Sequence, residues 1–390
     1  MRIVLLMPFF GPSRQVRGPV VQATEICRQL ALRGHTVSVV TTSIDVDRGT
    51  QTNKWVQRDG YRVFHAEASG IQTVPPYYTP AVKEPLTEAI QDADVLYLRV
   101  GLTLTNEIAR RIAARFNVPF VYNAEGCLCP VRLRTKAVAK WGFLRLFERR
   151  ILRHAKRLHA ATEQEATNYL SQGAARSRID VIPNGIVLPD LDRDNLLFAQ
   201  PESSFQPTVL FLGRIVSMKG PDRLIEAFQK ILSQHDAQLV IAGPESDFSH
   251  QLMQSTKRVE GLAERVHFPG VLQGVEKDAA LRSADLFALP SDSEGLPNAL
   301  LEALAYGLPC IASPECHVPE IERLGAGMIV DPNVDEIARA MMSLFSDPVM
   351  LKDMGHAARN LAASKFSMDS VVEQVEASLF KARGESEDFK

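Results

Sequence analysis

Two acidic residues in the segment 290–312, PSDSEGLPNALLEALAYGLPCIA, have a spacing that suits a sugar phosphate. Glu294 precedes a predicted short helix, and Glu302 follows eight residues later, inside that helix. A helix start offers free N–H groups and a partial positive charge, which together can hold a phosphate. The two carboxylates could then accept hydrogen bonds from hydroxyl groups on either side of it. A nucleotide sugar is one such compound, and the backbone concerned is that of Gly295, Leu296, Pro297 and Asn298.

The local pattern around these acids predicts a strand end, a loop, a helix and a second strand. Pro297 suits the first helical turn, and Leu300 and Leu304 recur at helical spacing. Gly307 suits a left-handed residue that ends the helix. The same pattern is also ordinary α/β structure, in which a Glu near a helix start is favourable without any ligand.

Two cations lie in a second loop, which begins at the end of the apolar strand TVLFLG. Arg214 and Lys219 are five residues apart, and Gly213 precedes them directly. Cations held in a loop at a strand end can clamp a diphosphate. A pair of solvated charges would give the same sequence, so both interpretations stay open at this point.

The first part of the chain, residues 2–42, has the pattern of a strand, a loop, a helix and a strand. Its loop contains Gly18 but neither a G-x-G-x-x-G motif nor a P-loop motif. The loop would lie at the carboxyl end of the first strand, where α/β sheets bind ligands. Arg14 and Arg17 could therefore meet an anion there, or could simply be solvated. Glu125 follows a later strand and would face the same crevice.

Strand and helix patterns alternate through both halves of the chain, on either side of a polar, aperiodic stretch. This predicts an α/β fold of two Rossmann-like doubly wound domains that face a central cleft. We expect an N-terminal domain at 1–188, a linker at 189–206 and a C-terminal domain at 207–367. The last helix, about 368–384, is expected to pack back on the N-terminal domain. Residues 43–60 lack periodicity and are expected to form a loop.

The composition is that of an ordinary globular protein, with 390 residues, 45% hydrophobic, 23% charged and a net charge of −2. This balance gives no reason to expect a nucleic-acid partner. Five cysteines are expected to stay reduced, and Cys127-x-Cys129 lacks a second pair at zinc-binding spacing, so no metal is expected. No apolar run approaches the ~18 residues of a membrane span. Residues 3–10 fit a buried strand better than a signal peptide, so a cytoplasmic location is expected.

The segment 131–158 has a strong charge bias, with ten Lys or Arg residues and a single acid, Glu148. A helical pattern places one apolar stripe opposite most of these cations, formed by Leu144, Phe147, Ile151, Ala155 and Leu158. A basic amphipathic helix can lie on an anionic membrane surface, here the inner face of the cell membrane. It can also pack its stripe into the core and leave its charges in water.

These motifs together resemble those of the family 4 retaining glycosyltransferases of the GT-B fold, and the resemblance spans nearly the whole chain. It rests on Gly213-Arg214 with Lys219-Gly220, the segment PSDSEGLPNALLEALAYGLPCIAS, Pro183-Asn184-Gly185 and Gly34-His35. The combination of Glu294-x7-Glu302 with Arg214 and Lys219 is specific, whereas each motif alone is not. The resemblance implies transfer of a sugar from a nucleotide-sugar donor, with UDP or GDP as the expected nucleotide and no further cofactor.

The resemblance also implies a role for each residue of the donor site. Arg214 and Lys219 would neutralise the leaving diphosphate, in place of a metal ion. Glu294 would contact the hydroxyl groups of the donor sugar, together with the backbone of residues 295–298, and Glu302 would hold the ribose. The spacing of the two acids, about 12 Å in a continuous helix, would then span one donor molecule and not form an acid–base pair.

The remaining expected contacts are less specific, and the acceptor side departs from the family pattern. Gly18 would approach the phosphate and the acceptor, and the base would lie near Pro244 and Leu272. Gly18-Pro19 stands where many relatives have Gly-Gly, and Glu125-Gly126 stands where many have a histidine. Glu125 could orient a hydroxyl group of a saccharide or lipid-linked acceptor, or could pack against Arg132 or Arg134.

Two further classes of function share this fold and these motifs. A GT-B enzyme of another kind is one: an epimerase would convert a nucleotide sugar without an acceptor, and a phosphorylase would carry pyridoxal phosphate. A non-catalytic protein that binds sugar nucleotides is the other. The intact set of Arg214, Lys219, Glu294 and Glu302 argues against a decayed site.

Overall fold

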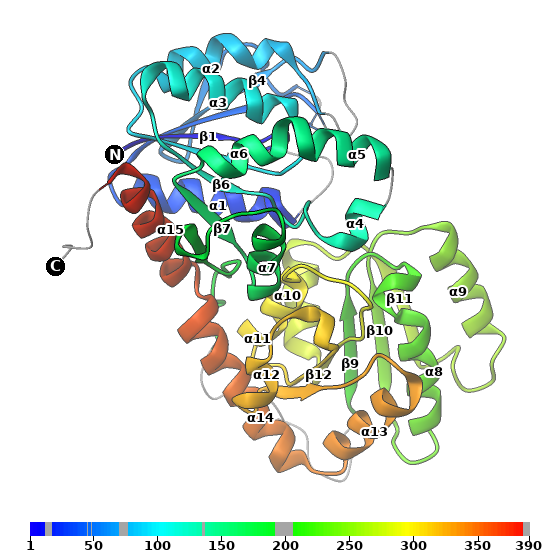
Figure 1. Ribbon diagram of the computed structural model, residues 1–390. Helices are drawn as coiled ribbons and strands as arrows, with labels where there is room; N and C mark the ends of the chain where they lie inside the picture. The colour runs from blue at the N-terminus through cyan, green and yellow to red at the C-terminus, as the bar shows by residue number, and fades with distance from the viewer. Residues whose placement is uncertain are drawn as a thin grey trace. The chain divides into compact units, whose positions relative to one another are not determined.

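The computed structural model describes residues 1–11, 18–44, 46–47, 49–69, 77–134, 137–191 and 206–384. Contacts divide the chain into two units, each built on its own sheet (Figure 1). Unit 1 comprises residues 1–185 and the segment from residue 368 onward, and unit 2 comprises residues 186–367. Most of the stretch expected as a linker, and the cations Arg14 and Arg17, lie outside the described residues.

Unit 1 contains an eight-stranded sheet with the order β3-β4-β2-β1-β5-β6-β7-β8. All neighbouring strands run parallel except β3 and β4. The strand order reverses on either side of β1, as in a doubly wound fold. The strands are β1 (Arg2–Leu6), β2 (Thr36–Thr42), β3 (Trp55–Arg58), β4 (Tyr61–Ala66), β5 (Val95–Arg99), β6 (Phe120–Asn123), β7 (Arg157–Ala160) and β8 (Ile179–Val181).

Helices cover both faces of this sheet. Alternate residues of β1 therefore belong to two separate hydrophobic cores, one on each face. Ile3 and Leu5 pack with α1 (Gly18–Leu32) and α15 (Met368–Arg383). Val4 and Leu6 belong to the core on the other face. That face is covered by α2 (Lys83–Ile90), α3 (Leu104–Phe116) and α6 (Arg149–His154), and α7 (Glu163–Ser171) follows β7.

Unit 2 contains a six-stranded, fully parallel sheet with the order β11-β10-β9-β12-β13-β14. Its strands are β9 (Thr208–Leu212), β10 (Gln238–Ala242), β11 (Val266–Gly270), β12 (Leu286–Leu289), β13 (Cys310–Ala312) and β14 (Gly327–Ile329). Its helices are α8 (Pro221–Ile231), α9 (Asp247–Lys257), α10 (Gly274–Ser283), α11 (Asn298–Ala305), α12 (Glu320–Arg323), α13 (Val334–Phe345) and α14 (Pro348–Leu361). The predicted fold class, α/β with two doubly wound parallel sheets, is thus confirmed.

Two predicted features of unit 1 are wrong. The stretch 43–60 is not all loop, because β3 pairs antiparallel with β4. The hairpin turns at Asp59-Gly60, whose φ angles are 37° and 86°, and Asp-Gly is a typical hairpin signal. The basic segment is also not one amphipathic helix. It consists of α4 (Pro130–Arg134), α5 (Ala137–Phe143), a π-helical turn (Leu144–Glu148), α6 and the start of β7.

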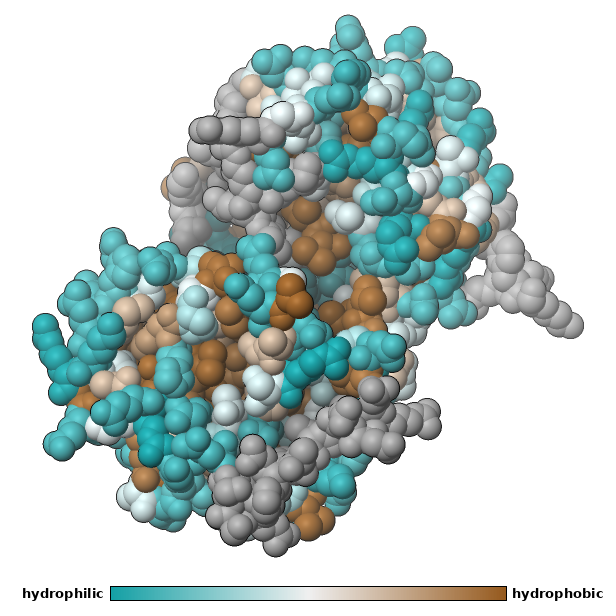
Figure 2. Space-filling model, turned by 180° about the vertical axis from the view of Figure 1, so that it is seen from behind, coloured by the Kyte–Doolittle hydropathy of each residue, from teal (hydrophilic) through white to brown (hydrophobic). Residues whose placement is uncertain are grey.

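On the face that Figure 2 shows, hydrophilic residues predominate and hydrophobic residues lie in separate groups. Among the described residues, no helix is both long enough and apolar enough to span a membrane.

Helix α15 should be integral to the stability of unit 1, because its apolar face is part of the core. Leu379 is fully buried there. We expect Leu379→Ala to lower the free energy of unfolding by about 2–5 kcal/mol, the usual cost of a Leu-sized cavity. Leu32→Ala, at a position that is 68% exposed, should change it by less than ~0.5 kcal/mol. Urea unfolding of both variants checks this, and equal small losses would contradict it.

Candidate functional site

The loops after β9 and β12 bring most of the predicted site residues of unit 2 to one sheet edge. These two strands pair directly, with Val209 opposite Leu286. The strand order reverses at β9, and such points are the usual ligand-binding positions of α/β sheets. Gly213, Arg214 and Lys219 follow β9, and Glu294 follows β12.

Lys219 and Glu294 form an ion pair between these loops. Their side chains are only 14% and 8% exposed, so little water screens the pair. Ser291 also donates a hydrogen bond of 2.8 Å from its Oγ to Oε1 of Glu294. The family resemblance implied separate roles for these two residues, and their direct contact was not predicted. Arg214, by contrast, is exposed to solvent.

Backbone contacts hold the two loops in register. The N–H of Asp292 donates to the carbonyl of Met218 at 2.8 Å, and Arg223 donates to the carbonyl of Pro290 at 2.9 Å. Gly220 has a φ of 71°, and a Cβ there would lie 2.3 Å from the carbonyl oxygen of Pro290. Only glycine fits this approach. These contacts therefore hold in place the two loops that carry Lys219 and Glu294.

Backbone hydrogen bonds also join the ends of β9, β10 and β11, where their loops begin. The N–H of Gly213 donates to Ala242, and that of Gly243 donates to Gly270. A Cβ at Gly243 would lie 1.7 Å from the carbonyl oxygen of Gly213. Pro244, which is exposed, and Leu272, which is half-buried, follow β10 and β11 directly, on the side of β9 away from β12.

Helix α11 carries Glu302 and begins one residue later than expected. Pro297 is its N-cap and not part of the first turn, and the Pro297 side chain makes no capping hydrogen bond. Glu302 is bound by Lys277 of α10, with 2.8 Å between Nζ and Oε1. This partner was missed because it lies 25 residues away on another helix. Gly307 has a φ of 76°, so the predicted left-handed end of the helix is confirmed.

Glu125 of unit 1 is the second residue after β6, and its partner is a residue that sequence reasoning missed. Oε1 of Glu125 accepts a hydrogen bond of 2.6 Å from Nε of Arg99, the last residue of β5. The Arg99 side chain is only 1% exposed, and the two residues form an ion pair. Neither Arg132 nor Arg134 pairs with the carboxylate, although Arg132 donates to the backbone carbonyl of Glu125. The signal for Arg99 was a cation at the end of a buried apolar strand.

The backbone around this pair is strained. Val100, Leu102 and Glu125 have φ angles of 70°, 61° and 52°. A positive φ is unfavourable for residues with a side chain, especially the β-branched Val100, and such strain concentrates at functional sites. Gly18, the remaining candidate of unit 1, is the first residue of α1.

Two buried carboxyl groups hold the strained loops in place. Glu148 accepts a hydrogen bond from the N–H of Leu102 at 3.2 Å and another from the hydroxyl of Tyr122. Glu165 accepts from the N–H groups of Gly126 and Ala161, both at 2.7 Å. Burial raises the pKa of both carboxyl groups to about 7, and these hydrogen bonds oppose the shift.

The stability of unit 1 should therefore depend on the ionisation of Glu148. Its folded pKa lies above the unfolded value, so its contribution to stability falls as the pH rises from about 4.5 to about 7. In Glu148→Gln the amide can accept from Leu102 and donate to Tyr122, without titrating. We expect the free energy of unfolding of the wild type, relative to this variant, to fall by about 2–3 kcal/mol between pH 4.5 and 8.

Urea unfolding at several pH values measures this difference. Glu163→Gln is a suitable control, because the Glu163 side chain is 72% exposed and should not alter the pH dependence. An identical pH dependence in Glu148→Gln and the wild type would contradict the prediction.

Two protein-family models match the chain. Residues 17–185 match the glycosyl transferase 4-like domain, and residues 192–361 match the group 1 glycosyl transferases. One relative is a D-inositol 3-phosphate glycosyltransferase of Nocardia farcinica, 30% identical over 61% of this chain and 56% of the relative. Another is a GDP-mannose-dependent monoacylated alpha-(1-6)-phosphatidylinositol monomannoside mannosyltransferase of Corynebacterium glutamicum, 31% identical over 43% of this chain and 46% of the relative. The matched regions thus span about half the length of these relatives.

Solved structures resemble the whole chain. HepE of Anabaena, in complex with UDP and glucose, has a TM-score of 0.74 and 18% identity, over 97% of this chain and 99% of that one. A sucrose-phosphate synthase from Thermosynechococcus elongatus has a TM-score of 0.73 and 20% identity, over 96% and 97%. At this identity the likeness concerns the fold, which is GT-B.

Proposed function

We propose that this protein transfers a sugar from a nucleotide-sugar donor to an acceptor hydroxyl group, because residues 17–185 match the glycosyl transferase 4-like domain and residues 192–361 match the group 1 glycosyl transferases. The observation that carries the proposal is the ion pair of Lys219 and Glu294 at the point where the strand order reverses, in the same loop that carries Arg214. Transfer would occur with retention of the anomeric configuration and without a metal ion. These family matches favour transfer over an epimerase or a non-catalytic binding protein.

The chemistry at the anomeric carbon requires stabilisation of the leaving diphosphate more than a strong nucleophile. Arg214 and Lys219 are the cations that would supply it, from a loop that backbone contacts already hold in position. A cation that is fixed before the reaction needs no reorganisation as charge develops on the leaving group. The start of α11, around residues 295–298, would complete the anion site.

The two carboxylates would then bind opposite ends of the donor. Glu294 has Lys219 as its partner. An arriving diphosphate would compete with Glu294 for Lys219, and hydroxyl groups of the sugar would take the place of Lys219 on the carboxylate. Glu302 would accept from the ribose, with Lys277 holding it in position. Pro244 and Leu272, after β10 and β11, would border the base.

The acceptor would be a saccharide or a lipid-linked saccharide, bound by unit 1. Glu125 would orient its hydroxyl group, because Arg99 fixes this carboxylate at the end of β6 through Oε1. Several relatives are by name enzymes of phosphatidylinositol mannosides, which supports an acceptor of this class. Residues 131–158 would contact an anionic membrane surface, where such an acceptor is found.

Loss of either cation should slow the chemical step. We expect Arg214→Ala or Lys219→Ala to lower turnover by ~100-fold or more, the usual cost of one preorganised charge-stabilising group. Lys230→Ala removes an exposed cation of α8 and should leave turnover within about twofold. Steady-state assays with a matched donor test this, and near wild-type turnover in both site variants would refute the assignment.

Nucleotide binding should raise the thermal stability of the chain. At a ligand concentration of about 100 Kd, we expect stabilisation by about 2.7 kcal/mol, since the ligand binds only the folded state. UDP, GDP and their sugar conjugates are to be compared by thermal shift, first on the wild type and then on Glu302→Ala. The variant should respond less to every nucleotide. No shift with any nucleotide in the wild type would argue against the donor site.

A further inference from the structure

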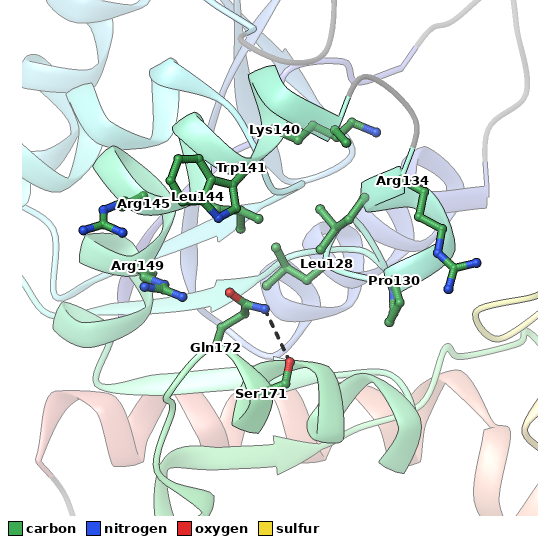
Figure 3. A pocket seen from close by; sticks show the side chains of 12 residues that line it. Leu128, Pro130, Arg134, Lys140, Trp141, Leu144, Arg145, Arg149, Ser171 and Gln172 are labelled. Carbon is green, nitrogen blue, oxygen red and sulfur yellow. Dashed lines mark hydrogen bonds between the residues drawn. The ribbon is translucent and has the colours of Figure 1, made fainter.

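A pocket of about 470 Å³ opens on unit 1 and is lined largely by residues of the basic segment (Figure 3). Its apolar side chains include Leu128, Leu133 and Leu144, of which Leu128 and Leu144 are buried. α4, α5 and the π-helical turn line it, together with the end of α7. Its volume lies within the range of small-molecule sites, about 300–1,000 Å³.

The rim of this pocket is cationic. Arg134, Arg145 and Arg149 line it and are exposed to solvent, whereas none of its lining residues is acidic. Arg145 and Arg149 lie at one end and Arg134 at the other, with Leu128 between them (Figure 3). Glu148, the single acid of the segment, is fully buried and faces Tyr122 and Leu102. Among the residues described as lining the pocket, none therefore offsets the positive charge at the rim.

Large apolar side chains are also exposed on the same short helices. Trp141 lines the pocket with 63% of its surface exposed, and the guanidinium of Arg145 lies 5.6 Å from the centre of its ring. Val131, Val138 and Leu146 are between 51% and 87% exposed. Exposed apolar side chains close to uncompensated cations are typical of surfaces that meet amphiphiles.

We infer that this pocket binds a phosphorylated amphiphile, such as a phospholipid or a polyprenyl phosphate. The guanidinium groups of Arg145 and Arg149 hold the phosphate, and the first carbons of the hydrocarbon chain lie against Leu128, Leu133 and Leu144. The cations alone would suit any anion, and the leucines alone any apolar group. Their combination in one hollow selects a ligand that carries both. The inference rests on the proposed contact of residues 131–158 with anionic lipid and gives it a defined site.

Trp141 can report binding directly, because the chain has two tryptophans and the other is Trp55 of β3. The experiment uses the full chain with Trp55→Phe, titrated with dihexanoyl phosphatidic acid below its micellar concentration. Parallel titrations use dihexanoyl phosphatidylcholine, glycerol 3-phosphate and inorganic phosphate. We expect a saturable change in Trp141 fluorescence with phosphatidic acid, at least about 10-fold weaker binding of both chain-free phosphates, and no response to the zwitterionic lipid. Equal affinity for free phosphate, or no saturable response to phosphatidic acid, would overturn the inference.

Two double variants with the same loss of charge separate this site from a diffuse basic surface. Arg145→Gln with Arg149→Gln removes two lining cations, whereas Arg150→Gln with Arg153→Gln removes two exposed cations outside the lining. We expect the first pair to weaken phosphatidic acid binding by about 10-fold or more and the second by less than about threefold. Equal losses in both pairs would overturn the pocket in favour of general attraction to the membrane.

The nucleotide-induced thermal shift of the same proteins keeps the two proposals apart. Both double variants lie in unit 1, and the donor-site residues lie in unit 2. If the wild type shows a nucleotide shift but no response to phosphatidic acid, the pocket fails and the proposed function stands. If phosphatidic acid binds and no nucleotide shifts the stability, the donor site fails and the pocket stands.

Discussion

The ion pair of Lys219 and Glu294 joins the two loops on which the candidate donor site depends. Each residue comes from a different strand end, 75 positions apart in the sequence. Both side chains are largely buried, so removal of either would leave an unpaired charge in a poorly solvated position. The contacts of Gly220, Arg223 and Asp292 also join the two loops, and so they fix the backbone that carries both charges. The two loops are therefore joined by a charge pair that is already formed without a ligand.

In unit 1, too, an ion pair joins residues at two neighbouring strand ends, here those of β5 and β6. The Arg99–Glu125 pair lies on backbone with positive φ angles, and Glu148 and Glu165 bind the N–H groups of the loops concerned. The cost of the strain is offset by hydrogen bonds to buried carboxyl groups. Burial raises the pKa of both carboxyl groups to about 7, so the groups that hold the loops beside Glu125 change their charge near neutral pH.

The sequence was sufficient for the parts of the fold that depend on local pattern. Buried parallel strands are continuous apolar runs, and α11 has a proline before it and a left-handed glycine at its end, so both were predicted. Strand β3 was missed although Asp59-Gly60 marks its turn, because its own four residues do not alternate clearly between apolar and polar. Helix α9 was missed because its start is fixed by a capping box of two serines, Ser246 and Ser249, which is a weak signal.

The partners of the site residues could not be predicted, for a different reason. Lys277 for Glu302, Arg99 for Glu125 and Glu294 for Lys219 are 25 to 75 positions apart and meet only through tertiary packing. Residue type and local position indicated the chemistry of one residue of each pair, as a charge at a strand or helix end. Which opposite charge would face it depends on strand order, and β9 and β12 are neighbours although β10 and β11 separate them in the chain.

The π-helical turn shows how local geometry and charge combine in the basic segment. A uniform helix predicted that Leu144, Phe147 and Ile151 would form an apolar stripe, but the structure also buries Glu148 on this side, while Phe147 stays half-buried. The one acid of the segment thus serves the strained loop at Leu102 and the hydroxyl of Tyr122, far from solvent. Because burial raises its pKa to about 7, it also carries less negative charge near neutral pH than an exposed glutamate would. Fixing the loop after β5 therefore leaves the outer face of the same segment with its positive charge uncompensated, which is the property that an anionic ligand would recognise.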